Sequence, residues 1–337
     1  MILLALAAAA ATANPHPADL KTFKDWIVGC DNVRSCQANA LGPESGDDFL
    51  TLVLSRSGNP SEPAVLFVPL SEKIAAGARL ALEVDGTQVV TLTAGKKMGA
   101  ELRLTRTVLV ALANGQKIAV VDDQKSAVGE TSLSGLSAAM LFIDDQQRRI
   151  GTTGALRAVG TKPDTAVPAP PFVPLLSVPP ASPKPPRTIT VAAATKLIGP
   201  DSATCDYASS KVAPRSYRLD AAHSLVLIDH PCGNGAYNYF TSVFVLDESG
   251  PPRPAQFDLA PGMGESTGDG TGDLTNGDWN PKTGSLSSYE KGRGLGDCGS
   301  DESYVWDGRH FRLSQQNVMG ECRGSVDFIR VWTARTK

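Results

Sequence analysis

The sequence predicts a mostly β (α+β) protein with two domains joined by a proline-rich linker. Short runs of β-branched residues and leucine recur along the chain, separated by Gly, Pro and Asp. Aromatic residues make up only 6% of the chain, whereas it has 32 glycines and 24 prolines. Because domains average roughly 150 residues, a chain of 337 residues is long enough for two separate cores.

The first 13 residues are expected to form a signal peptide. An apolar run from Ile2 to Ala11 is followed by small residues at Ala11 and Ala13, which fit cleavage before Asn14. No Lys or Arg precedes this run, and Pro15 closely follows it. No later segment stays apolar for the roughly 18 residues that a membrane helix needs. We therefore expect an exported chain whose mature form has no membrane span.

The N-terminal domain, residues 14–160, is predicted as an antiparallel sheet or sandwich with one or two helices. Leu104–Ala113 is ambiguous between helix and strand, and its length favours a helix. Ser134 is interpreted as the cap of a second helix, because Leu136, Met140 and Ile143 recur at helical spacing. The predicted strands are Asp48–Ser55, Ala64–Val68, Arg79–Val84, Val89–Thr93 and Lys117–Val121.

The linker is placed at residues 161–187, where ten prolines occur between positions 163 and 186. Proline lacks a backbone donor and favours extended conformation, so we expect a stiff spacer. Phe172, Leu175 and Leu176 are the residues that would attach its middle to a domain surface. Limited proteolysis within 163–186 is expected to release two folded fragments.

The C-terminal domain, residues 188–337, is predicted as antiparallel β. Asp307-Gly308 indicates a type I′ hairpin turn, so the strands on either side of it should pair. The predicted strands are Ser224–His230, Tyr237–Leu246, Ser285–Tyr289, Ser303–Trp306, Arg309–Leu313 and Phe328–Thr333.

Six cysteines indicate disulfides and therefore an oxidising compartment. Their spacing does not match a zinc site, and an even number leaves no odd thiol for catalysis. The last four cysteines allow three connectivities. Because folding back at the Asp307 turn brings residue 298 near 317, we predict the pairs Cys30–Cys36, Cys205–Cys232 and Cys298–Cys322.

The sequence predicts no metal, no cofactor and no catalytic residue. The four histidines lie without a second ligand at metal spacing and are interpreted as structural. Asp229 beside His230 suggests a Ser-His-Asp group, but no G-x-S-x-G motif occurs. The acidic segment 264–278 departs from the spacing of a calcium loop and is interpreted as a solvated turn. A net charge of −3 argues against nucleic acid.

The segment KGRGLGD, residues 291–297, is the candidate ligand site. Its glycines allow backbone N–H groups to converge on an anion, and Lys291 and Arg293 add positive charge. Tyr289 and Tyr304 lie nearby in the sequence and complete the predicted site. The other interpretation is a tight turn whose glycines relieve strain beside a disulfide, and the sequence favours it. Aromatic residues on strands, Trp306 above all, are usually core.

Two resemblances follow from longer motifs. FKDWIVGCDNVRSC, LALEVDGTQVV and ETSLSGLSAAM, within residues 20–145, resemble the invasion-associated locus B family of proteobacterial envelope proteins. PCGNGAYNYF, LTNGDWNPKTGSLSSYEKGRGLGDCG, YVWDGRHFRL and ECRGSVDFIRVWTAR resemble a six-cysteine family of uncharacterised proteobacterial periplasmic proteins, a domain of unknown function. The second resemblance covers almost the whole chain and implies a periplasmic location without implying any chemistry.

These observations predict a non-catalytic periplasmic protein that acts as a binding or accessory module of the envelope. Its partner is expected to be an envelope protein or an anionic ligand near Lys291 and Arg293. The alternative is a cell-envelope enzyme acting on glycan or peptide. A cleft lined by convergent ionisable groups would distinguish the two.

Overall fold

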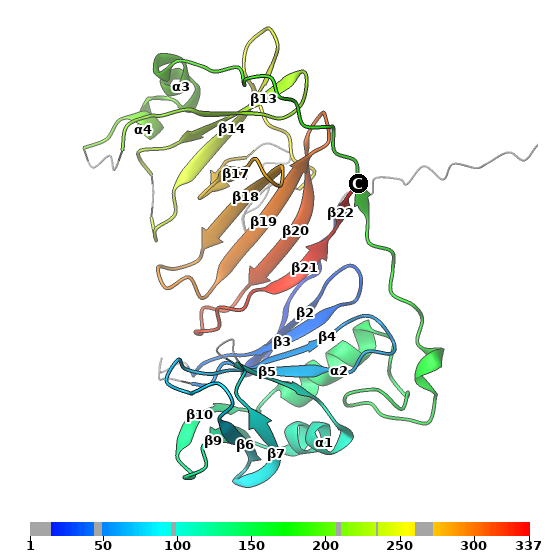
Figure 1. The fold of residues 1–337 in the computed structure, drawn as a ribbon. Helices are drawn as coiled ribbons and strands as arrows, with labels where there is room; N and C mark the ends of the chain where they lie inside the picture. Colours follow the sequence, from blue (N-terminus) through cyan, green and yellow to red (C-terminus); the bar gives the residue numbers. More distant parts are fainter. Residues whose placement is uncertain (1–14, 44–48, 96–98, 207–209, 234, 260–271) are drawn as a thin grey trace, which may run out of the picture.

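The computed structural model describes residues 15–337 except 44–48, 96–98, 207–209, 234 and 260–271. The predicted signal peptide therefore lies outside the described residues. The protein is mostly β, with antiparallel sheets in both halves, as the sequence predicts. Figure 1 shows the N-terminal half in blue to green, the C-terminal half in green to red, and a green segment that runs along one side between them.

The N-terminal half contains two antiparallel sheets. The six-stranded sheet has the order β1-β2-β3-β4-β5-β8 and the four-stranded sheet the order β10-β9-β6-β7. Two predicted strands, Arg79–Val84 and Lys117–Val121, have the predicted bounds. The strands are β1 (Lys21–Phe23), β2 (Trp26–Cys30), β3 (Cys36–Ala40), β4 (Val53–Arg56), β5 (Val65–Pro69), β6 (Arg79–Val84), β7 (Thr87–Thr93), β8 (Gly99–Arg103), β9 (Lys117–Val121) and β10 (Ala127–Ser132).

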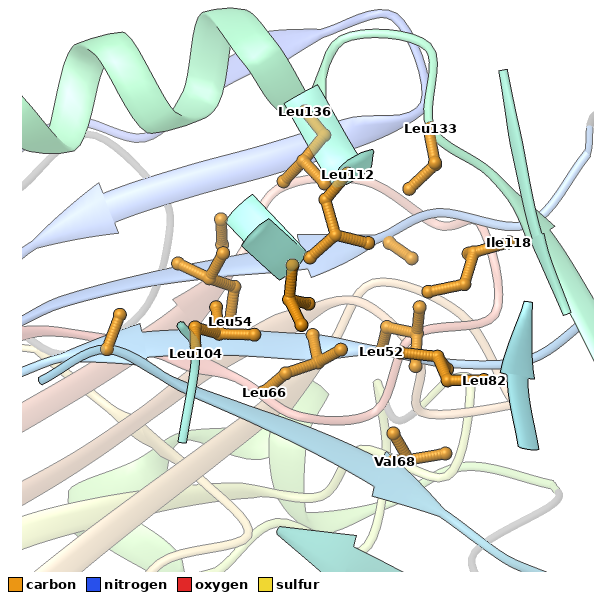
Figure 2. Packing of buried hydrophobic residues seen from close by; sticks show 14 of the residues in the cluster. Leu52, Leu54, Leu66, Val68, Leu82, Leu104, Leu112, Ile118, Leu133 and Leu136 are labelled. Atoms are coloured by element: carbon orange, nitrogen blue, oxygen red, sulfur yellow. The ribbon is translucent and has the colours of Figure 1, made fainter. Parts of the chain in front are cut away.

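One continuous core joins these two sheets to two helices, α1 (Arg106–Asn114) and α2 (Leu136–Gln146). Figure 2 shows Leu54 and Leu66 of the larger sheet facing Leu112 of α1. Each side chain is at most 1% exposed, and burying a leucine contributes about 1.5–3 kcal/mol. The leucine-rich strands and the apolar helix faces therefore stabilise this half together.

The starts of the two helices differ in how well they were predicted. The helix predicted over Leu104–Ala113 forms as α1, and the Thr105 hydroxyl caps it by accepting from the Val108 N–H. Ser134 does not cap α2, so that prediction is wrong. The residue before α2 is Gly135, with φ +100°, and a Cβ there would lie 1.7 Å from the Phe23 carbonyl oxygen. The close approach of β1 determines where this helix begins.

The linker is attached at its middle. Leu175–Leu176 forms β11, which pairs in parallel with β22 (Arg335–Thr336) near the C-terminus. Leu176 is buried, whereas the Phe172 side chain is 99% exposed. Of the three linker residues predicted to make contacts, Leu176 therefore packs and Phe172 does not.

The C-terminal half contains two five-stranded antiparallel sheets. One has the order β12-β13-β14-β15 with β16 also on β14, and the other the order β17-β18-β19-β20-β21. Aliphatic and aromatic side chains from both sheets form a second core, which includes Leu227, Trp279 and Trp306. The elements are α3 (Val191–Ile198), α4 (Pro200–Ala203), β12 (Arg215–Arg218), β13 (His223–Asp229), β14 (Phe240–Asp247), β15 (Arg253–Pro254), β16 (Leu274–Thr275), β17 (Asp278–Asn280), β18 (Ser285–Lys291), β19 (Gly299–Trp306), β20 (Phe311–Met319) and β21 (Ile329–Thr333).

The predicted hairpin between β19 and β20 forms, but its turn is shifted by one residue. Trp306 pairs with Phe311, and the Asp307 N–H donates to the His310 carbonyl. The central residues are therefore Gly308 and Arg309. Gly308 has φ +99° while Asp307 has a negative φ, so the type I′ assignment is wrong. A positive φ at the first central position is the requirement of a type II′ turn.

The structure contains the three predicted disulfides, Cys30–Cys36, Cys205–Cys232 and Cys298–Cys322. Cys30 and Cys36 face each other as the last pair of the β2–β3 ladder. Cys298 precedes β19 and Cys322 follows β20, and these strands are paired from Gly299 with Met319 onward. Strand pairing thus brings the two sulfurs of this bridge together.

The two halves contact each other outside the linker. Ile27 and Leu41 pack with Met319 and Ile329 in a small buried cluster. The Arg323 guanidinium donates to the Gly42 and Lys24 carbonyls and to the Asp25 carboxylate. The assignment of residues 14–160 and 188–337 as separate domains remains a prediction. Among the described helices, none is long and apolar enough to cross a membrane.

Candidate functional site

The glycine-rich segment is the loop of the β18–β19 hairpin. Lys291 pairs with Gly299, and the Gly292 N–H donates to the Cys298 carbonyl at 2.8 Å. The Gly296 N–H donates to the Arg293 carbonyl at 2.9 Å. These two N–H groups are therefore used within the loop. A Cβ at Gly292 would lie 2.8 Å from the Cys298 sulfur, so this glycine allows the close approach of the disulfide.

Lys291 lies between two tyrosine rings. Its ammonium nitrogen is 5.5 Å from the centroid of the Tyr237 ring and 5.9 Å from that of Tyr289. These distances fall within the range of cation–π attraction. The Asn238 amide holds the Lys291 backbone in place by donating to its carbonyl at 2.8 Å and accepting from its N–H at 3.1 Å. A segment 53 residues earlier in the chain thus completes the site.

The surface around Lys291 is open and apolar. The Tyr237 side chain is 70% exposed and that of Leu295 is 75% exposed. The Tyr289 ring is partly buried, 6.0 Å from the Phe328 ring. We call the group Tyr237, Tyr289, Lys291 and Leu295 the Lys291 surface. It can offer aromatic area and one ammonium group to a ligand.

Arg293 lies in the loop but already has a partner. Its Nε and Nη2 donate to the two carboxylate oxygens of Asp297 at 2.7 and 2.5 Å. Asp297 also accepts from the Gly324 N–H at 2.7 Å. The Arg293 hydrogen bond lowers the pKa of Asp297 although its burial acts in the opposite direction. Arg293 therefore fixes the loop and has its charge compensated there.

Tyr304 does not belong to the Lys291 surface, which corrects the sequence prediction. Its side chain is fully buried, and its ring packs edge-on against the Phe257 ring at 4.9 Å. Burial, together with the negative charges of Glu302 and Asp258, raises the pKa of its hydroxyl well above the usual value. The residue is part of the second core, as aromatic residues on strands usually are.

The hydrogen bonds that join His230, Ser242 and Asp273 do not follow the order of a catalytic triad. The Asp229 carboxylate accepts from Arg215 and Thr241. The His230 Nε2 lies 2.7 Å from the Ser242 hydroxyl, which donates to Asp273 at 2.7 Å. In a triad the carboxylate bonds the opposite ring nitrogen, whereas Asp273 bonds the serine. The serine proton is therefore directed to the carboxylate.

Metal-binding groupings are absent from the part of the chain that the structure describes: no three His, Cys, Asp or Glu residues there are placed to hold an ion. Within the acidic segment 264–278, Glu265 and Asp269 lie outside the described residues. Asp278 accepts from Arg215, so it is engaged in a surface ion pair.

The chain is similar to a curated protein over most of its length and to a solved structure over a smaller part. It is 28% identical over 341 residues to the uncharacterized protein YpfG of Escherichia coli (strain K12), covering 94% of this chain and 93% of that one. A crystal structure of invasion associated protein b from Bartonella henselae matches with a TM-score of 0.32 and 12% identity, covering 39% of this chain and 99% of that chain. A family model described as "Protein of unknown function (DUF1176)" matches residues 20–335. Since that match covers nearly the whole chain, the protein belongs to this family, which confirms the resemblance that its C-terminal motifs predict.

Proposed function

We propose that the protein is a non-catalytic binding or accessory protein of the periplasm, and that it binds an anionic ligand at the Lys291 surface. The observation that carries the proposal is the Lys291 ammonium held between two tyrosine rings beside exposed apolar side chains. Three disulfides suit an oxidising compartment such as the periplasm. The arrangement of His230, Ser242 and Asp273 does not favour the alternative of a cell-envelope enzyme.

The chemistry of this surface favours an anion that carries a flat apolar group. The lysine ammonium supplies a charged donor, and a charge-assisted hydrogen bond is about twice as strong as a neutral one. Tyr237 supplies exposed ring area on which a ring or sugar face can stack. Asp297 compensates the charge of Arg293. Lys291 is therefore the side chain that would contact the negative charge of the ligand.

Phenyl phosphate is a suitable probe, because it combines an aromatic ring with a dianion. We expect saturable binding, measured by isothermal titration calorimetry, that weakens as the NaCl concentration rises. Lys291→Ala should weaken binding by about ten-fold, in line with the loss of a hydrogen bond to a charged group. The control is Lys282→Ala, an exposed lysine at the other end of β18.

Two results would contradict the proposal. Benzyl alcohol, a neutral probe of similar shape, should bind much more weakly than phenyl phosphate. Equal binding of the two probes would mean that the surface does not recognise charge. If Lys291→Ala and Lys282→Ala lose the same affinity for phenyl phosphate, the protein attracts the anion by its general charge and has no site at Lys291.

A further inference from the structure

The N-terminal half contains a cavity of about 390 Å³ whose lining residues are all remote in sequence from the Lys291 surface. It opens between the start of β2 and the end of β3 on one side and the start of β9 and the end of β10 on the other. The volume falls within the roughly 300–1,000 Å³ range of ligand pockets. The residues that line it are Asp25, Leu41, Pro43, Phe49, Gln116, Lys117, Glu130, Thr131 and Ser132.

One wall of the cavity is apolar. Leu41, Pro43 and Phe49 line this wall, and Leu41 is held in place by its packing in the small cluster between the two halves. The phenyl ring of Phe49 offers a large apolar area for contact with a ligand. The wall therefore suits a small apolar side chain.

Among the described residues that line the cavity, the charged groups are balanced. Burial disfavours ionisation of Asp25, but hydrogen bonds from Arg323 and Ser132 outweigh it and lower the pKa of this carboxyl group. Asp25 is therefore ionised at neutral pH, and Arg323 compensates its charge with a contact of 2.8 Å. Lys117 and Glu130 remain, one of each sign, and they pair at 2.9 Å.

Breaking the ion pair between Lys117 and Glu130 costs little free energy. The two side chains are 54% and 53% exposed, and an ion pair of this kind contributes only about 0–1 kcal/mol. A molecule that carries both an ammonium and a carboxylate group can replace it with two ion pairs, so that no charge is left without a partner. An ion of a single sign would leave one of the two side chains unpaired.

We propose that this cavity binds a small zwitterion, a free amino acid with an apolar side chain. Its carboxylate contacts the Lys117 ammonium and its ammonium contacts the Glu130 carboxylate. Its side chain lies against Leu41, Pro43 and Phe49. This site is independent of the Lys291 surface, and either can fail without the other.

Three probes that share a phenyl ring test the charge requirement. L-phenylalanine has both charges, 2-phenylethylamine has only the ammonium group, and 3-phenylpropionate has only the carboxylate. Binding to the full chain is measured by chemical-shift changes in amide NMR spectra. We expect saturable binding of L-phenylalanine, about five-fold tighter than that of either other probe, which is the upper range for one partly exposed ion pair.

Variants that remove one charge at a time test whether Lys117 and Glu130 bind the amino acid. Lys117→Met and Glu130→Gln should each weaken L-phenylalanine binding by about five-fold. The control is the ion pair between Lys125, in the turn from β9 to β10, and Glu83 of β6, which has the same 2.9 Å contact and is not among the residues that line the cavity. Lys125→Met and Glu83→Gln should leave binding unchanged. Thermal melting of all four variants shows that each is folded.

The proposal is overturned by absence of saturable L-phenylalanine binding to the unaltered protein. It is also overturned if a probe with one charge binds as tightly as the zwitterion, or if the control pair loses as much affinity as the cavity pair. Because the phenyl phosphate titration reports on Lys291, its result does not decide the outcome of this test.

Discussion

Asp297 holds together two segments of the C-terminal half. Its carboxylate accepts two hydrogen bonds from Arg293 within the hairpin loop and one from the Gly324 N–H, on the segment that also carries Arg323. The Cys298–Cys322 disulfide joins the same two segments. The charged group and the covalent bond therefore restrict the same part of the backbone.

Asp297 should make stability depend on pH in the acid range. The pKa of Asp297 is lower in the folded protein than in the unfolded chain, because Arg293 hydrogen-bonds its charged form. Its contribution is thus fully present above the unfolded value of about 3.9 and is lost as pH falls through the folded value. Asp297→Asn should lower the free energy of unfolding at pH 7, measured in urea, by about 1.5–3 kcal/mol.

At pH 3 the free energies of unfolding of the original protein and of Asp297→Asn should differ less than they do at pH 7. The exposed Asp123→Asn is the control and should show no such change. A constant difference at pH 7 and pH 3 would mean that the charge of Asp297 does not stabilise the fold.

The candidate site was predicted in part. Lys291 stands out in the sequence because glycines and basic residues meet there, and its ammonium group does lie between the two tyrosine rings of the candidate site. Tyr237 and Asn238 were missed as site residues, because only tertiary packing brings their segment to the hairpin. Tyr304 was included wrongly, because closeness in sequence does not show which face of a strand a side chain occupies.

At the scale of single elements, alternation predicts strands with one buried face. Strand β6 alternates between buried and more exposed residues, and its bounds were predicted correctly. Strand β2 is buried at all five positions. Trp26 and Val28 face the core of their own half, whereas Ile27 faces Met319 and Ile329 of the other half. A pattern in the sequence cannot reveal that second contact, so β2 was missed.

The start of α2 gives an element-scale prediction. Gly135→Ala should be strongly destabilising, because the residue has φ +100° and its new Cβ would lie 1.7 Å from the Phe23 carbonyl oxygen. The backbone strain contributes about 1–2 kcal/mol, and the displacement of β1 adds to it. Gly77→Ala is the control, since it has φ +86° with no atom within 4 Å of the added Cβ.

Urea unfolding of both glycine variants separates the two causes. Gly77→Ala should lose only the stability that corresponds to the strain of a left-handed backbone at a residue with a Cβ. If Gly135→Ala is no less stable than Gly77→Ala, the contact with β1 does not determine where α2 begins.

At the scale of the whole molecule, the linker is one of several connections. Arg323 makes three hydrogen bonds to the N-terminal half, and Asn39 donates to the Asp327 carbonyl from the opposite direction. The linker strand β11 pairs with β22. The sequence predicts a spacer from its prolines, but it gives no sign of these contacts, because they join distant parts of the chain. The bonds from Arg323 to Lys24 and Asp25, for example, join residues about 300 positions apart.

The sequence predicts that cleavage of the linker releases two fragments, on the premise that few contacts cross between the halves. The contacts of Ile27 and Arg323 contradict that premise, so the cleaved halves should stay associated. A specific protease site inserted after the exposed Ala181 cuts the chain while leaving β11 on the N-terminal fragment. We expect the fragments to elute together in size-exclusion chromatography, because the apolar cluster around Ile27 and Ile329 stays buried between them. Arg323→Ala should loosen this complex, since it leaves Asp25 without its cationic partner.

The exposed Arg309→Ala is the matched control, because this arginine lies on the β19–β20 turn, and the bonds between the halves do not involve it. The cleaved control should elute as one complex at protein concentrations where the cleaved Arg323→Ala variant begins to separate. Two separate peaks from the cleaved but otherwise unaltered protein would contradict the expectation. That result would mean that the contacts around Arg323 and Ile27 hold the halves together only while the linker keeps their local concentration high.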